Sequence, residues 1–253
     1  MLAIIIVSAL LYVLWVFVKQ KNTYTNYFVY SASILHGVIC FFSIFDENGW
    51  KLNIINDVLL VSWLSVIIVI LFKIESIWVK LPLLFFVLIS FVLVDINPVL
   101  LYHHYQGFSW QLDLHISLSI LAYSVLSVAT LYAVSLWVHI KKIKNPDFGS
   151  GTDFGIVALI DEEKKLAQII VLGWLILSTS LVSGVIFIDD FMQQQLGHKV
   201  VFSILAWLIF GSLIIGRMNR GWRGEKLISL TITGMTLLAT GYLGSKIVIE
   251  WIL

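Results

Sequence analysis

Long apolar segments recur along the whole chain, and they restrict its fold more than any other feature. Eight segments stand out, at residues 2–18, 25–45, 57–72, 77–94, 114–140, 166–188, 200–216 and 227–249. A helix needs roughly 20 apolar residues to cross a bilayer. Only 12% of the 253 residues are charged, whereas a soluble domain carries about a quarter. The sequence therefore predicts an all-α, polytopic transmembrane helix bundle of about eight spans, forming a single transmembrane domain over residues 1–253.

The basic residues are divided unevenly between the two sides of the predicted bundle. Of the 16 Lys and Arg residues, 13 fall on one side and three, Lys51, Lys199 and Lys246, fall on the other. Because basic loops stay in the cytoplasm, both termini and the loops near 46–56, 95–113 and 189–199 are predicted to lie outside.

Familiar catalytic and nucleotide-binding motifs do not occur in this sequence. It contains no Walker loop, no GxGxxG motif before a strand and no GxSxG motif, and its single cysteine, Cys40, excludes a multi-cysteine metal site. The net charge of +1 gives no sign of nucleic-acid binding. We therefore expect a protein that is not an enzyme and whose surroundings are membrane lipid. Arg223 and Lys226 could bind lipid headgroups or could simply anchor a cytoplasmic turn.

Histidine is the residue type with the strongest functional signal, because ionisable residues inside a span are costly and imidazole is a common axial ligand of haem iron. His36 lies near the middle of the second span. Its role is either that of a ligand or proton site, or that of a neutral histidine hydrogen-bonded to a neighbouring helix. His115 opens the fifth span and shares a helix face with Ser119 and Tyr123, either as an iron ligand or as an interfacial residue. His198 opens the seventh span, where it could face His115 or simply begin a helix.

The depth of these histidines predicts which of them can share one iron. His115 and His198 start their spans on the same predicted side, so they form the candidate pair. His36 lies about nine residues into its span, on the order of 13 Å deep, and marks a separate site or none. His103 and His104 are expected in a solvated loop, and His139 at the inner interface.

Several segments resemble the cytochrome c assembly family of haem-handling membrane proteins. They are DLHISLSILAY at 113–123, LAW at 205–207, GRMNRGWRG at 216–224 and GYLGSK at 241–246. The resemblance covers roughly residue 30 to the C-terminus and is greatest to a small bacterial inner-membrane subfamily of the YpjD type. It implies eight spans with both ends external, a location in the bacterial inner membrane, and haem and other cytochrome c assembly proteins as partners.

The same resemblance implies a ligand set that this chain carries only in part. His115 matches the first external histidine of the family, and His36 is the best match to a histidine within the membrane. The loop 189–199 lacks the Trp-rich motif, the chain ends before a second external histidine, and Gly216-Arg217 stands where the second membrane histidine would be.

Three hypotheses for the function follow. The first is a haem-binding or haem-handling factor of c-type cytochrome assembly that binds and positions haem without making bonds. The second is a non-haem scaffold or accessory protein that kept the fold and lost the ligands, which the missing Trp-rich motif favours. The third is a transporter of a small solute or proton with His36 as a relay.

Overall fold

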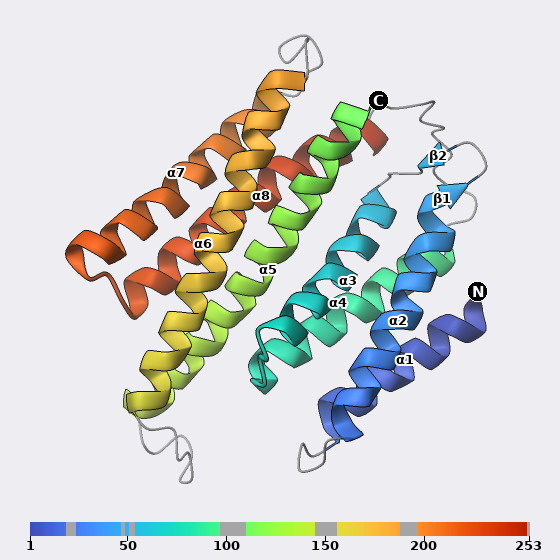
Figure 1. The fold of residues 1–253 in the computed structure, drawn as a ribbon, viewed down its shortest axis with the longest axis horizontal. Helices are drawn as coiled ribbons and strands as arrows, with labels where there is room; N and C mark the ends of the chain where they lie inside the picture. Colours follow the sequence, from blue (N-terminus) through green and yellow to red (C-terminus); the bar gives the residue numbers. More distant parts are fainter. Residues whose placement is uncertain are drawn as a thin grey trace. The chain divides into compact units, whose positions relative to one another are not determined.

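The structure, a computed structural model, describes residues 1–18, 24–46, 49–50, 54–96, 110–144, 156–187 and 197–251. Eight helices account for almost all of it: α1 (Leu2–Phe17), α2 (Tyr24–Ile44), α3 (Ile54–Leu71), α4 (Ile77–Ile96), α5 (Trp110–Lys144), α6 (Ile156–Phe187), α7 (Gly197–Arg220) and α8 (Glu225–Trp251) (Figure 1). Two two-residue strands, β1 (Phe45–Asp46) and β2 (Gly49–Trp50), pair as an antiparallel hairpin after α2.

The predicted all-helical membrane fold is confirmed, with one helix for each predicted span. Within the described residues, the six helices α2 to α7 are long and apolar enough to cross a membrane, and α1 is a shorter apolar helix of 16 residues. The orientation of the termini stays a prediction.

Helices α5 and α6 extend furthest beyond their predicted spans. α5 has 35 residues and α6 has 32, which at 1.5 Å per residue gives about 50 Å each, against a hydrocarbon core of ~30 Å. α6 begins at Ile156, so its first turns include the charged segment up to Lys165, which precedes the sixth predicted span. Both helices therefore extend past the bilayer at the end that carries Lys141 and Lys165.

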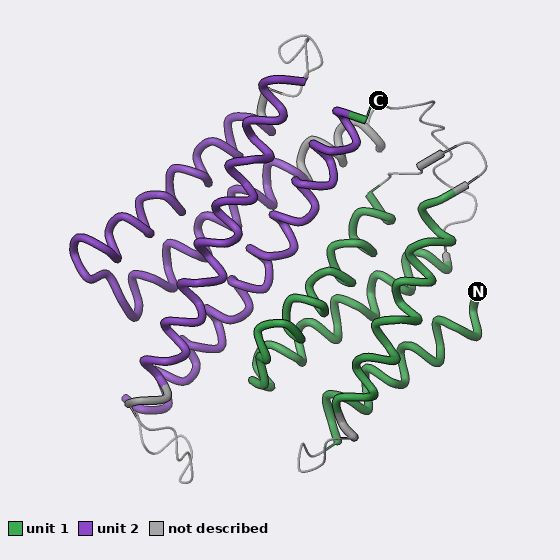
Figure 2. The backbone as a smooth tube through the Cα atoms, viewed as in Figure 1, with its two compact units in different colours: residues 1–110 green, residues 111–253 purple. Residues whose placement is uncertain are grey.

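The chain divides into two compact units, residues 1–110 and 111–253 (Figure 2). In unit 1, helices that follow one another in the sequence pack together: α1 with α2, α2 with α3, and α3 with α4. The first and last helices, α1 and α4, also pack against each other. The prediction of a single domain concerns how the two units combine, and it stays a prediction.

Polar contacts and small residues hold the helices of unit 1 together. The Ser8 hydroxyl donates to the carbonyl of Ala32, and the Trp63 indole N–H donates to the carbonyl of Ser33 at 2.8 Å. A Cβ added to Gly37 would stand 2.8 Å from the Trp63 ring. Lipid is as apolar as leucine, so close packing and hydrogen bonds between helices are what associate them in a membrane.

Unit 2 has two distinct ends, which its side-chain contacts define. At one end, His139 of α5 contacts Glu162 of α6, and Lys144 of α5 contacts Glu225 of α8; we call it the basic end. At the opposite end, which we call the His115 end, His115 of α5 contacts Ser180 of α6. Successive helices of unit 2 therefore run in opposite directions between the two ends.

Candidate functional site

His115 lies in the second turn of α5, and two residues of α6 hold its imidazole ring. Nδ1 lies 2.9 Å from the carbonyl oxygen of Ser180 and 3.1 Å from the hydroxyl oxygen of Ser183. The Ser183 hydroxyl donates its own proton to the Ser180 carbonyl at 2.8 Å. Both partners of Nδ1 therefore act as acceptors toward it.

These contacts determine which ring nitrogen of His115 carries the proton. A carbonyl oxygen can only accept, so Nδ1 is the protonated nitrogen and Nε2 keeps its lone pair. A metal-binding histidine usually donates its other ring N–H to a carbonyl or carboxylate, which fixes the tautomer and orients the ring. The surroundings of His115 are those of an imidazole prepared to coordinate a metal through Nε2.

A small cavity of about 150 Å³ adjoins the His115 ring. Its lining comes from α5, α6 and α7: His115, Ser119, Tyr123, Leu177, Ser180, Leu181, Gly184, Val185, Lys199, Val200, Ser203 and Ile204. The sequence predicted that the first three share a helix face, and all three line this cavity. Ser119 also hydrogen-bonds to the Ser180 hydroxyl at 2.7 Å, which adds a second link between α5 and α6.

Several residues of this site were missed by the sequence analysis. Ser180 and Ser183 are 65 and 68 positions from His115, and no local pattern connects them with it. Lys199 contributes the cationic group of the cavity and also lies over the ring of Tyr242, at 5.3 Å. Its signal in the sequence was that it is one of only three basic residues on the predicted outer side.

The donor groups of this cavity fit haem, but the cavity is too small to enclose a haem molecule. A neutral imidazole whose Nε2 keeps its lone pair is a suitable axial ligand, and the Lys199 ammonium suits the carboxylates of haem. The volume of 150 Å³ is below the roughly 300–1,000 Å³ of typical ligand sites, so a bound porphyrin would need surface beyond the cavity. Among the described residues, no three His, Cys, Asp or Glu side chains gather as a metal site.

The structure brings the start of α7 to His115, as the predicted pairing with His198 requires. Lys199, the next residue, lines the cavity. Position 198 lies in α7, but its side chain lies outside the described part of the structure. The pairing of His115 with His198 stays a prediction.

His36 is fully buried in unit 1, within a hydrogen-bonded group to which four helices contribute. Its Nδ1 lies 3.3 Å from the Tyr12 hydroxyl of α1, and its Nε2 lies 3.5 Å from the Ser62 hydroxyl of α3. Ser62 in turn hydrogen-bonds to Ser90 of α4 at 3.0 Å, and the ring of Phe91 packs edge-on against the imidazole. Both ring nitrogens face hydroxyl groups, which favours the neutral hydrogen-bonded alternative over iron ligation.

His139 lies at the opposite end of unit 2 from the His115 cavity. His139 contacts Glu162 at 2.9 Å and is 13% exposed at the basic end of unit 2. His103 and His104 lie outside the described residues. Gly216, at the place where the resemblance puts a second membrane histidine, is covered by Trp222: an added Cβ would stand 2.3 Å from the indole ring. A side chain at this position therefore requires Trp222 to move.

Comparison with known proteins identifies the family. The family described as Cytochrome C assembly protein matches residues 2–253 of this chain. The chain belongs to the cytochrome c assembly protein family. The match begins nearer the N-terminus than the predicted region of residues 30–253, so it includes the first helix.

Individual relatives of this cytochrome c assembly protein agree with its family. The chain is 28% identical over 205 residues to the Escherichia coli (strain K12) "Inner membrane protein YpjD", which covers 80% of this chain and 76% of the relative. It is 23% identical over 165 residues to the "Cytochrome c biogenesis protein CcsA" of Synechococcus sp. (strain CC9311), covering 54% and 53%. No solved structure matches.

These relatives confirm two predictions from the sequence. The resemblance to the cytochrome c assembly family and to its YpjD-type members is correct. Together with the apolar helices, an inner membrane relative confirms a multi-pass protein of the bacterial inner membrane. The chain is thus a membrane protein of cytochrome c biogenesis, and neither the scaffold nor the transporter hypothesis is favoured.

Proposed function

We propose that this protein handles haem during c-type cytochrome assembly and that His115 supplies an iron ligand. The observation that carries the proposal is the pair of acceptors at Nδ1 of His115, the Ser180 carbonyl and the Ser183 hydroxyl. They hold the ring in the tautomer whose Nε2 can coordinate iron. Family membership supports haem as the cargo, because the CcsA relatives are named for cytochrome c biogenesis.

The role of the protein in this proposal is to bind and orient haem, without catalysing a bond change. His115 fixes the position of the iron, and Lys199 places a positive charge in the same cavity, where it suits a haem carboxylate. His198, at the start of α7, is the predicted second ligand. His36, with both ring nitrogens near hydroxyl groups, has a structural role in unit 1. Other assembly proteins would deliver or accept the haem.

A haem titration of the full-length protein in detergent tests this proposal. The wild-type protein should develop a Soret band, His115→Ala should lose it, and His198→Ala should shift or weaken it. His103→Ala and His104→Ala should leave it intact. His139→Ala is the matched control, because it removes a histidine from the other end of the same helix.

Two outcomes would contradict the proposal. A wild-type protein that gains no Soret band would support the non-haem accessory alternative. A Soret band that His115→Ala leaves unchanged would show that another residue binds the iron.

A further inference from the structure

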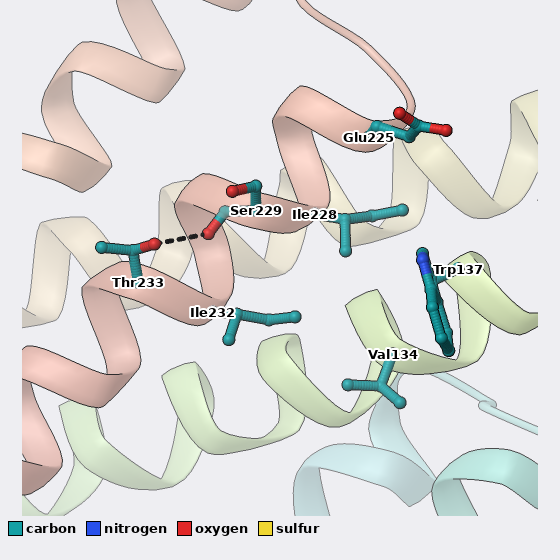
Figure 3. Close-up of a pocket in the computed structure, with 7 residues that line it drawn as sticks. All are labelled: Val134, Trp137, Glu225, Ile228, Ser229, Ile232 and Thr233. Carbon is teal, nitrogen blue, oxygen red and sulfur yellow. Dashed lines mark hydrogen bonds between the residues drawn. The ribbon is translucent and has the colours of Figure 1, made fainter.

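A second, larger pocket lies between α5 and α8 toward the basic end of unit 2. It measures about 480 Å³, and its lining residues are Val134, Trp137, Glu225, Ile228, Ser229, Ile232 and Thr233 (Figure 3). This volume falls within the roughly 300–1,000 Å³ of typical ligand sites. We call it the α5–α8 groove. No residue of the His115 cavity belongs to it.

Charged side chains gather at one end of the α5–α8 groove. The Lys141 ammonium lies 3.7 Å from the centre of the Trp137 ring, and the Lys144 ammonium contacts the Glu225 carboxylate at 2.7 Å. The hydrogen bond from Lys144 holds the pKa of Glu225 below its ordinary value, so Glu225 is ionised and its charge is balanced. Lys141 therefore leaves this end of the groove with an excess of positive charge.

The rest of the groove is mainly apolar and open. Val134, Trp137 and Ile232 are each between 36% and 42% exposed although their side chains are apolar. In Figure 3, Val134 and Ile232 face each other across the groove, and Glu225 and Thr233 lie at its opposite ends. An apolar channel that ends at a cation matches the chemistry of an anionic phospholipid, whose acyl chains adjoin a phosphate group. Basic pockets between transmembrane helices bind such headgroups.

The size of the groove favours a lipid over a protein as its occupant. The lining of α8 extends from Glu225 to Thr233, a rise of about 12 Å along the helix. A stable protein–protein interface buries at least ~1,000 Å², which is far more than a groove of two helical turns offers. An acyl chain needs only a narrow apolar channel of this length.

We propose that the α5–α8 groove binds one anionic phospholipid, with an acyl chain between Val134 and Ile232 and the phosphate at Lys141. The bound lipid covers the exposed apolar side chains of the groove and pairs the lysine charge. The proposal does not depend on haem binding.

Native mass spectrometry of the full-length protein in mild detergent tests this proposal. After addition of equal amounts of phosphatidylglycerol and phosphatidylcholine, the wild-type protein should retain mainly one phosphatidylglycerol molecule. Lys141→Gln should lower the ratio of retained phosphatidylglycerol to phosphatidylcholine by about fivefold, because one lysine contributes roughly that factor at a membrane surface. Ile232→Trp should fill the groove and abolish the retained lipid.

Matched controls separate the groove from general effects. Lys164→Gln removes a lysine that is 65% exposed at the same end, and Ile215→Trp enlarges a side chain that is 61% exposed on α7; both should retain lipid as the wild type does. Val134→Phe is a second way to fill the groove if Ile232→Trp fails to fold. Equal retention of the two lipids by the wild type, or full retention by both filling variants, would overturn the proposal.

Discussion

At the scale of single residues, the most constrained glycine is Gly216, at the end of α7. The Trp222 ring covers it, and the Trp222 N–H donates to the Gly216 carbonyl at 3.3 Å. Gly221 and Gly224, with φ of +65° and +55°, allow the chain to turn back between them. This turn is therefore a packed structure, which goes beyond the simple basic anchor that the sequence suggested.

We expect Gly216→Ala to destabilise the protein by roughly 1–3 kcal/mol, as overpacking does. The added methyl group would overlap the Trp222 ring, which lies 2.3 Å from the Cβ position. Thermal unfolding in detergent measures the loss. In a Trp222→Ala background the same substitution should cost little, because the clash is gone. Equal losses in both backgrounds would show that the ring is not the cause.

The second residue-scale prediction concerns His36, which is fully buried and hydrogen-bonded to Tyr12 and Ser62. His36→Ala should lower the free energy of unfolding by roughly 2 kcal/mol or more, since it leaves a cavity and removes one hydrogen-bond partner from each of the Tyr12 and Ser62 hydroxyl groups. The haem spectrum that depends on His115 should not change.

A neighbour on the same helix provides the control for His36. Ile34 is 68% exposed, so Ile34→Ala should leave the stability almost unchanged. A lost Soret band in a stable His36→Ala protein would instead make His36 part of the haem site.

At the scale of helices, the start of α8 depends on a residue of α6. The Gly224 N–H donates to the Glu163 carboxylate at 2.8 Å, and the Gly224 carbonyl accepts the first hydrogen bond of α8, from Ile228. Glu163, which is 7% exposed, therefore acts as the N-terminal cap of α8, although it belongs to α6. A carboxylate at a helix N-terminus also interacts favourably with the helix dipole.

We expect Glu163→Ala to reduce the stability by about 1 kcal/mol, the usual cost of losing an N-cap. Glu163→Gln should lose less, because its amide oxygen can still accept from Gly224. Thermal unfolding of the two variants beside Lys164→Ala, an exposed neighbour, measures the difference. If the Gln and Ala variants were equally unstable, the charge of Glu163 rather than its hydrogen bond would be responsible.

At the scale of the whole molecule, the contacts of unit 2 place basic residues from three helices at one end. They lie at the end of α5, the end of α7 and the start of α8: Lys141, Lys142, Lys144, Arg217, Arg220 and Lys226. At the His115 end, Lys199 is the basic residue whose side chain the structure describes. This asymmetry is the one that the positive-inside rule uses to orient membrane proteins.

We therefore expect the basic end to face the cytoplasm and both termini to face the periplasm. Reporter fusions after Lys144 and after Lys226 should be active only with a reporter that works in the cytoplasm. A periplasmic reporter that is active at either site would contradict this orientation and would place His115 on the cytoplasmic side.

The sequence by itself determined the helices of this protein and their approximate ends. Spanning a bilayer depends on the length and apolar character of a continuous segment, which are local properties. For the same reason the charge asymmetry, the family and the shared helix face of His115, Ser119 and Tyr123 could be predicted. The true lengths of α5 and α6 were not predicted, because their charged ends continue as helix beyond the apolar segments.

Only the tertiary structure decided what each polar side chain contacts. Ser180 holds His115 from 65 residues away, and Tyr12 and Ser62 hold His36 from 24 and 26 residues away. Such partners depend on which helices are neighbours and on how each is rotated about its axis. A hydrophobic pattern that covers almost the whole surface of a membrane helix does not specify that rotation, so the proton position on His115 and the α5–α8 groove emerge only from the packed helices.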